Sequence, residues 1–427
     1  MKVLRVYHAG RDAAHRRREN ALRAQGVELI LVVPRTWSDG EARLTQEPFG
    51  IVELDIQRTG DINRHRYLDM SQAAELIKDE APDLLDIHEE PFSVAARQWL
   101  RITPSGLPIV MYTAQNIDKR FPPPFAQYEI AALSRVSALY PCSRQAGGVA
   151  RGKGFDGLIE VLPLGYDDAV ITPGHQSIGD DEIVLSFVGR LVAEKGVLDA
   201  VDLLARMQSV RPTRLALAGA GPLMAMVRQR AASHGVEDRL ELLGWSSPSE
   251  LAALYASTHF VLVPSRTTET WVEQFGRVIV EGQAGGAVVA GYATGSIPDV
   301  GGDPAVIVPE GDVEALADRL TALLQDPAEF ERRRREGISQ SATRTWLQVG
   351  ARQAALYSRV LRGDTGNPQP RSPRARRVAA RAEFGPTAAT GAGERPFALP
   401  FLRRGGTVPR LLGAAIDACA EIRARLA

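Results

Sequence analysis

At 427 residues the chain is long for a single domain, so two domains that each bury their own core are expected. Lys plus Arg and Asp plus Glu both number 51, a formal net charge of +0, so the overall charge gives no reason to expect a nucleic-acid partner. The two cysteines, Cys142 and Cys419, are far apart, which excludes a disulfide framework and a cysteine-based metal site and fits a reducing compartment.

The first seven residues are too few and too charged for a signal peptide. No run in the sequence approaches the roughly 20 apolar residues that span a bilayer. We therefore expect a soluble cytoplasmic protein.

The chain opens with a predicted βαβ unit: a strand over residues 3–7, a turn at 8–10, a helix over 12–25 and a strand over 27–33. His8, His15 and the run Arg16, Arg17 and Arg18 lie near the turn. They suit either a solvated helix face or the binding of an acceptor phosphate.

Two further strands, over 84–88 and 109–113, end in polar residues. Ligands of parallel sheets bind at the carboxyl ends of the strands, so His88, Glu89 and Gln115 are expected to face such a crevice. Gln115 can donate or accept a hydrogen bond but cannot take a proton, so its role would be positioning. His88 suits either a ligand contact or a structural histidine.

A turn-rich linker over 172–181 leads to a strand over 183–188, which is followed by Gly189, Arg190 and, five residues later, Lys195. A guanidinium and an ammonium at a strand exit and helix start can both reach a diphosphate. The alternative is a pair of surface cations. Further along, Trp245 follows a strand over 240–243 and suits either a stacking role or core packing.

The segment 264–281, PSRTTETWVEQFGRVIVE, connects a buried strand over 260–263 to a helix over 275–284. Glu273 lies at the mouth of that helix and Glu281 about two turns further. The mouth offers free N–H groups and a positive dipole end, and Gly276 allows a ligand close to the backbone. Two glutamates at this spacing also occur by chance in many helices.

The Glu-x7-Glu arrangement around Phe275-Gly276, preceded by Pro-Ser and joined to Arg190 and Lys195, resembles the signature of retaining GT-B glycosyltransferases, in particular glycosyltransferase family 4 (glycosyl transferases group 1). The resemblance covers residues 1–361 and is more specific in the second half. It implies an α/β fold with two Rossmann-like domains facing each other across a cleft. The expected divisions are an acceptor domain over 1–174, a donor domain over 175–345 and a helix over 346–362 that crosses back to the first domain. Residues 329–361 are strongly helical in pattern.

The resemblance also implies a reaction: a sugar moves from a nucleotide diphosphate sugar to a glycan, lipid or small-molecule acceptor. Arg190 and Lys195 would hold the diphosphate, and Glu281 would accept hydrogen bonds from the ribose. Glu273 and the backbone at Phe275-Gly276 would hold the donor sugar, with Gly10, Gly189 and Trp245 also on the donor side. No metal or other cofactor is expected, because the GT-B type does not need a bound divalent ion. The leaving phosphate is thought to help take the acceptor's proton, so no protein base is required.

Two positions depart from that family. Gly10 stands alone where relatives usually carry paired glycines that approach the donor phosphate. Gln115 replaces a histidine that many members place beside the sugar, and with His88 it is a candidate acceptor or sugar contact. These departures motivate one alternative, a GT-B protein that binds a nucleotide sugar, or only a partner, without transfer. A second alternative is a nucleotide-sugar epimerase or hydrolase of the same architecture.

Beyond the crossing helix, residues 363–427 form a tail whose first part is rich in Pro, Gly, Ala and Arg, a composition that predicts disorder. Its arginines are candidates for peripheral contact with anionic lipid, although a solubilising role is favoured: Arg371, Arg374, Arg376, Arg377 and Arg381. A short helix is predicted over 411–426.

Overall fold

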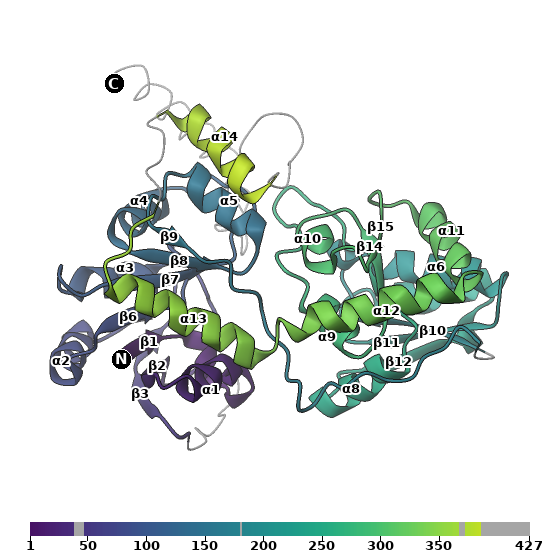
Figure 1. Cartoon of the computed structure of the whole chain (residues 1–427), viewed down its shortest axis with the longest axis horizontal. Coiled ribbons are helices and arrows are strands. Elements are labelled where there is room, and N and C mark those ends of the chain that lie inside the picture. Colours follow the sequence, from purple (N-terminus) through teal and green to yellow (C-terminus); the bar gives the residue numbers. More distant parts are fainter. Residues whose placement is uncertain (38–46, 180–181, 367–371, 386–427) are drawn as a thin grey trace.

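The computed structural model describes residues 1–37, 47–179, 182–366 and 372–385. They form two lobes side by side, each built on a parallel β-sheet with helices against its faces (Figure 1). The predicted α/β fold of two Rossmann-like domains is confirmed. Among the described residues, every helix is too short or too polar to span a bilayer.

The N-terminal lobe contains, within the described residues, a seven-stranded sheet in the order β3-β2-β1-β6-β7-β8-β9, and each neighbouring pair is parallel. Its strands are β1 (Lys2–Val6), β2 (Glu28–Pro34), β3 (Gly50–Leu54), β6 (Leu84–Ile87), β7 (Ile109–Thr113), β8 (Ala138–Pro141) and β9 (Leu158–Ile159). A small antiparallel pair, β4 (Ile56–Gln57) and β5 (Arg66–Tyr67), lies beside it. The α-helices are α1 (Arg17–Ala24), α2 (Met70–Glu80), α3 (Val94–Ile102), α4 (Phe125–Arg135) and α5 (Arg144–Gly152).

The C-terminal lobe has a six-stranded parallel sheet in the order β12-β11-β10-β13-β14-β15, again counted over the described ranges. Its strands are β10 (Ile183–Val188), β11 (Thr213–Ala218), β12 (Leu240–Gly244), β13 (Phe260–Val263), β14 (Val288–Tyr292) and β15 (Val306–Val308). The helices are α6 (Val197–Gln208), α7 (Met224–His234), α8 (Pro248–Ser257), α9 (Arg277–Ala284), α10 (Ile297–Gly301), α11 (Val313–Leu324) and α12 (Pro327–Ala342).

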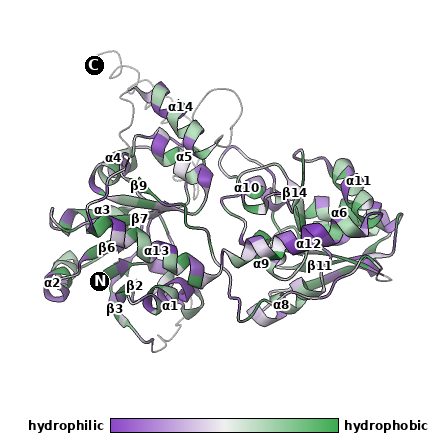
Figure 2. Cartoon of the chain, viewed as in Figure 1, coloured by the Kyte–Doolittle hydropathy of each residue, from purple (hydrophilic) through white to green (hydrophobic). Residues whose placement is uncertain are grey.

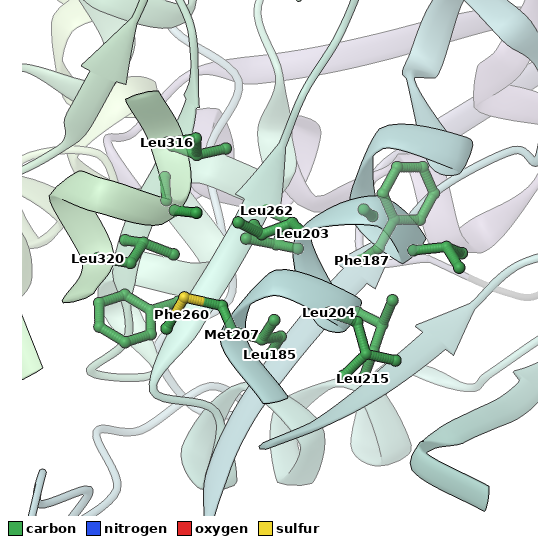
Figure 3. Close-up of a cluster of buried hydrophobic side chains, with 14 of the residues drawn as sticks. Leu185, Phe187, Leu203, Leu204, Met207, Leu215, Phe260, Leu262, Leu316 and Leu320 are labelled. Carbon is green, nitrogen blue, oxygen red and sulfur yellow. The ribbon is translucent and has the colours of Figure 1, made fainter. Parts of the chain in front are cut away.

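The core of this lobe lies between the sheet and helices α6 and α11 (Figure 3). Leu185 on β10 and Phe260 on β13 face this core. They share it with Leu204 from α6 and Leu320 from α11, and all four side chains are fully buried. Strands covered on both faces read as continuous apolar runs, which is why Ile183–Val188 was recognisable as a strand. Figure 2 shows the contrast between these hydrophobic strands and the largely hydrophilic helix α12.

The helical stretch predicted over 329–361 is divided into two helices, because the chain breaks between α12 and α13 (Trp346–Leu361) at the start of the predicted crossing helix. Thr345 is extended, and its side chain accepts a hydrogen bond from the N–H of Gln348, so a new helix begins there. The break lets α12 lie on the C-terminal lobe while α13 lies on the N-terminal lobe (Figure 1), where it packs against α1.

Buried polar groups hold α13 on the N-terminal sheet. The Tyr357 hydroxyl donates to the Asp86 carboxylate on β6, and Gln353 Nε2 donates to the same carboxylate at 3.1 Å. Arg5 on β1 forms an ion pair with Asp86 and a second one with Glu19 at 2.7 Å. Every charged group of this cluster therefore has a partner of opposite charge, as burial requires.

The predicted helix over 12–25 begins later than expected. Two short 3₁₀ turns, η1 (His8–Arg11) and η2 (Ala13–His15), precede α1, and Asp12 accepts from the N–H of Ala14 between them. Arg16 is buried and donates to the carbonyls of Gly10 and Arg11 at 2.6 and 2.7 Å.

Arg18 is also buried and donates to the carbonyl of Pro163 at 3.2 Å. Neither a solvated face nor an acceptor phosphate site therefore describes Arg16 and Arg18. Arg16 holds the loop after β1, whereas Arg18 ties α1 to Pro163 and to Gln353 of α13.

The expectation of a disordered tail is wrong for residues 373–384, which form α14 (Pro373–Phe384) against α5 (Figure 1). Phe384 is buried beside Gly147, where a Cβ atom would come within 2.9 Å of its ring. Glu383 accepts from Arg151 Nε at 3.2 Å. Residues 386–427, with the predicted helix over 411–426, lie outside the described residues, as does Arg371.

Candidate active site

A cavity of about 750 Å³ opens between the two lobes. The N-terminal lobe contributes the loops that follow β1, β6 and β7. The C-terminal lobe contributes Glu269, Thr270, Trp271, Gln274 and Arg277. His88, Glu89 and Gln115 all line it. The three residues follow the carboxyl ends of parallel strands, which is where the ligands of such sheets bind.

The 264–281 segment turns at Gly276, which lies at the N-terminus of α9 with φ of 75°. A Cβ atom there would lie 2.9 Å from Ile279 Cδ1, in a left-handed conformation that L residues avoid. The helix begins at Arg277, two residues later than predicted, and Phe275 packs in the hydrophobic core beneath it.

Lys195 and Glu273, which are 78 positions apart, meet at this turn. Lys195 Nζ lies 2.6 Å from Glu273 Oε2, and the same oxygen accepts from Ser265 Oγ at 3.0 Å. Glu273 is 6% exposed, and the ammonium also lies 5.1 Å from the centre of the Trp271 ring that lines the cavity. Gly196, with φ of 67°, allows this approach because a Cβ atom would lie 1.8 Å from the Pro264 carbonyl oxygen.

The other predicted donor residues have different surroundings. Arg190, just after Gly189, is exposed, with Nη2 3.7 Å from Glu194. Glu281 accepts from the Tyr255 hydroxyl at 2.9 Å and pairs with Arg277 Nε at 2.8 Å. The structure thus brings Lys195 and Glu273 together but leaves Arg190 and Glu281 outside that contact.

Trp245 is 81% exposed at the end of β12, so the core-packing alternative is wrong. Gly10 is buried in η1, where a Cβ atom would lie 3.0 Å from Tyr7 Cδ1. The residues lining the cavity include its neighbours His8 and Ala9 but not Gly10 itself. Close packing against Tyr7 therefore explains this glycine without any ligand.

His88 is a buried, hydrogen-bonded histidine that also lines the cavity. Its Nδ1 lies 3.1 Å from Arg5 Nη2, and because a guanidinium can only donate, Nδ1 accepts and the ring proton is on Nε2. Burial, reinforced by the positive charge of Arg5, lowers the pKa of His88 well below its ordinary value. The imidazole is therefore neutral near pH 7, stacked on Tyr112 at 4.1 Å between ring centres and lining the cavity.

Gln115 is fixed by two charged neighbours. With its amide nitrogen toward Glu129, it donates to Oε1 at 2.9 Å and accepts from Lys153 Nζ at 2.7 Å. Both partners lie in the N-terminal lobe, so the side chain is held rigidly at the cavity wall.

Glu90 is a cavity residue that the sequence did not single out. Its carboxylate accepts from the Ala114 N–H at 2.7 Å and from Thr113 Oγ1 at 2.8 Å. Burial raises the pKa of Glu90 to about 7 despite these hydrogen bonds. Its position directly after a strand that ends in polar residues was the feature of the sequence that could have identified it as a cavity residue.

The lobes are joined directly at the predicted motif. Asn116 Nδ2 donates to the Glu273 carbonyl at 2.9 Å, Lys119 Nζ to the Thr270 carbonyl at 2.7 Å, and Gln274 Nε2 to the Ala114 carbonyl at 3.0 Å. None of these side chains was predicted, since contacts between separate domains leave no periodic pattern in a sequence.

Comparison with known proteins agrees with this geometry. Residues 172–342 match the family described as glycosyl transferases group 1. Among curated proteins, a glycogen synthase of Mycobacterium tuberculosis is 32% identical over 193 residues, covering 44% of this chain and 45% of that protein. A D-inositol 3-phosphate glycosyltransferase of Corynebacterium glutamicum is 31% identical over 222 residues, covering 48% and 52%. The chain spans about half the length of the curated relatives it matches.

Solved structures cover more of the chain at lower identity. A glycosyltransferase from Rickettsia africae has a TM-score of 0.66 at 16% identity and covers 85% of this chain and 99% of that one. HepE of Anabaena, in complex with UDP and glucose, has a TM-score of 0.61 at 18% identity and covers 84% and 99%. These likenesses support the GT-B arrangement of the two lobes.

Proposed function

We propose that this protein is a retaining glycosyltransferase of family 4, which moves a sugar from a nucleotide diphosphate sugar to an acceptor. The observation that carries this proposal is the Lys195–Glu273 contact beside the cavity, inside the region that matches glycosyl transferases group 1. A cation and a carboxylate at a helix N-terminus suit a ligand that carries both anionic groups and hydroxyls.

The donor would be held by charges of both signs. A diphosphate placed between Arg190 and Lys195 would give each cation an anionic partner and would release Glu273 to accept from the sugar hydroxyls. Glu281 would exchange its present partner Arg277 for the ribose. Charged groups and hydrogen-bond donors of the protein are already in place where charge develops in the transition state. In a site without water, they supply much of the rate acceleration of such reactions.

In the transfer step, the bond from the anomeric carbon to the diphosphate oxygen breaks while the acceptor oxygen bonds to the same face of the sugar. The acceptor's proton passes to the leaving phosphate, so the step needs no protein base. Arg190 and Lys195 would offset the charge of the diphosphate in place of a divalent ion. His88 and Gln115 would position the acceptor or the sugar, which agrees with a neutral imidazole and a side chain that cannot take a proton.

The acceptor is proposed to be a hydroxyl-bearing glycan, lipid or small molecule. The names of the relatives, glycogen synthase and D-inositol 3-phosphate glycosyltransferase, agree with such an acceptor. The cavity offers it aromatic rings from Phe92, Tyr112 and Trp271. We also propose that the protein is cytoplasmic and contacts anionic lipid at the membrane surface. The contact would be made by Arg374, Arg377 and Arg381 of α14.

The test measures nucleoside diphosphate released from a panel of nucleotide sugars, with and without cell extract as acceptor. We expect release that requires the extract and falls about 100-fold or more in Lys195→Ala and Glu273→Ala. Lys78→Ala and Glu314→Ala, exposed residues of α2 and α11, are the matched controls and should release at the parental rate. Proton NMR of the product then reports the anomeric configuration.

Each other outcome counts against a specific part of the proposal. Binding of a nucleotide sugar without release in any condition would mean a binding protein or an epimerase, and release without an acceptor would mean a hydrolase. Unchanged turnover in Lys195→Ala would contradict the assigned site even if transfer were observed.

A further inference from the structure

Three side chains from separate loops of the N-terminal lobe converge beside the cavity. His8 follows β1, His65 precedes β5, and Glu89 follows β6. Their ligating atoms, two imidazole nitrogens and a carboxylate oxygen, all lie within 4.8 Å of one another. His8 and Glu89 also line the cavity, whereas His65 is completely buried behind them.

The hydrogen bond of His65 determines its free nitrogen. Nδ1 lies 3.1 Å from the Asp61 carbonyl oxygen, which can only accept, so Nδ1 carries the proton. In a neutral ring, Nε2 then presents a lone pair, and it makes no hydrogen bond within the described part of the chain. A histidine whose other nitrogen is fixed by a backbone carbonyl is the arrangement found around metal ions.

The free nitrogen of His65 faces another acceptor. Its Nε2 lies 3.9 Å from Glu89 Oε1, and both side chains are fully buried. Glu89 is otherwise held by His8, whose Nδ1 lies 2.7 Å from Oε2 and whose backbone N–H donates to Oε1 at 2.9 Å. Two buried acceptors facing each other are costly unless a cation lies between them.

The spacing suits a small divalent ion. A tetrahedral zinc ion with bonds of ~2.1 Å holds its ligand atoms ~3.4 Å apart. Measured to one carboxylate oxygen, Glu89 Oε1, the spacings are 2.8 Å from His8 Nδ1 and 3.9 Å from His65 Nε2, on either side of that value. All three ligand atoms lie within 4.8 Å of one another, so small side-chain shifts would complete the site. Trp37 packs against both imidazoles, 4.5 and 5.0 Å between ring centres, and limits their other orientations.

We propose that His8, His65 and Glu89 bind a divalent metal ion of the zinc type, with a coordination position open to the cavity. Two imidazoles and one carboxylate are ligands that zinc accepts in sites with an open position for water or substrate. The ion would offer that position to an oxygen of a molecule in the N-terminal half of the cavity. This site shares the cavity with His88 and Gln115 but is separate from Arg190, Lys195 and Glu273, so binding of the ion does not depend on the metal-free donor step.

The experiment uses the full chain, stripped with a chelator and dialysed, without any nucleotide sugar. Zn²⁺ binding is followed by calorimetry, and Co²⁺ binding by its visible absorption, whose intensity reports a low coordination number. We expect one ion per chain, bound about 100-fold or more weakly in His65→Ala and Glu89→Gln. His15→Ala is the matched control, because His15 lines the same cavity outside the cluster, and it should bind as the parent does.

The rival arrangement is a His65 imidazolium paired with Glu89. Nitrogen NMR of the histidine rings distinguishes the two, since an imidazolium keeps protons on both nitrogens, whereas a ligand loses the Nε2 proton when Zn²⁺ is added. A doubly protonated His65 that persists with excess Zn²⁺ would overturn the proposal. So would an absence of binding, or an equal loss of affinity in His15→Ala.

Should His65→Ala fail to fold by circular dichroism, His8→Asn replaces it, because His8 is partly exposed and Asn can still donate to Glu89. Zn²⁺ should raise the melting temperature of the parent and leave that of His8→Asn unchanged. An equal rise in both proteins would contradict the site.

Discussion

At the scale of single residues, the candidate site depends on close approaches that only certain side chains permit. Gly196 and Gly276 lie at the starts of α6 and α9 with positive φ, and each lets the chain pass where a Cβ atom would collide. The two turns together place Lys195 against Glu273. The charges are therefore positioned by backbone shape as much as by mutual attraction.

Replacing Gly276 with alanine tests this dependence. Its φ of 75° and a contact of 2.9 Å with Ile279 predict a loss of unfolding free energy of about 2 kcal/mol or more. Gly235→Ala is the matched control, since its φ is 66° but no atom lies within 4 Å of its Cβ position, so about 1 kcal/mol is expected. Urea unfolding measures both, and equal losses would show that packing at Gly276 contributes nothing.

At the scale of elements, α13 and α14 are bound to the N-terminal lobe by different means. α13 is held by buried hydrogen bonds to Asp86, and α14 by Phe384 against α5 and by the Arg151–Glu383 pair. The first contact links the crossing helix to the central strand β6, whereas the second joins two peripheral helices. Removing the contact to β6 should therefore lower the stability of the whole lobe, whereas removing the contact between α5 and α14 should affect only those two helices.

Tyr357→Phe removes one donor from the buried carboxylate of Asp86. A hydrogen bond to a charged group contributes about 1.5–3 kcal/mol, so the unfolding free energy should fall by that amount. Tyr128→Phe is the control, because the Tyr128 hydroxyl makes no hydrogen bond to the residues that the structure describes, and it should change stability by less than about 0.5 kcal/mol. Chemical denaturation followed by circular dichroism provides the comparison.

Phe384→Ala should release α14 from α5 without unfolding the lobe. Removing a buried phenyl ring costs ~3 kcal/mol, enough to open a short peripheral helix while the sheet stays intact. Hydrogen exchange should then accelerate across 373–384 and 144–152 alone. Val378→Ala, at a site that is 66% exposed on the same helix, should leave the exchange rates unchanged.

At the scale of the whole molecule, the cavity exists only because two lobes meet. The hydrogen bonds from Asn116, Lys119 and Gln274 cross the boundary at the segment that carries Glu273. Domain closure of this kind commonly completes a site around its ligand.

Asn116→Ala should shift the lobes toward separation. The loss of one hydrogen bond of about 0.5–1.5 kcal/mol changes the closing equilibrium about 2- to 10-fold. Small-angle scattering should show a larger radius of gyration, while the melting temperature stays within error of the parent, because neither lobe core is touched. Asn20→Ala, on α1, is the control, and an equal expansion there would exclude a specific effect of the interlobe bond.

Sequence patterns identified the local parts of this protein well. Buried parallel strands are continuous apolar runs, so Ile183–Val188 and Phe260–Val263 were predicted closely. Errors fell at the 3₁₀ turns before α1 and at the helix α14, whose arginine-rich composition favours disorder until it packs on α5.

The sequence by itself determined the alternation of strands and helices, the two-domain division and the charged residue types of the 264–281 segment, because these follow from local periodicity and spacing. Only the tertiary structure decided that Lys195 meets Glu273, that Arg16 and Arg18 are buried, and that His8, His65 and Glu89 converge. Contacts between residues distant in the chain depend on how whole elements pack, and no short-range pattern in the sequence records that packing.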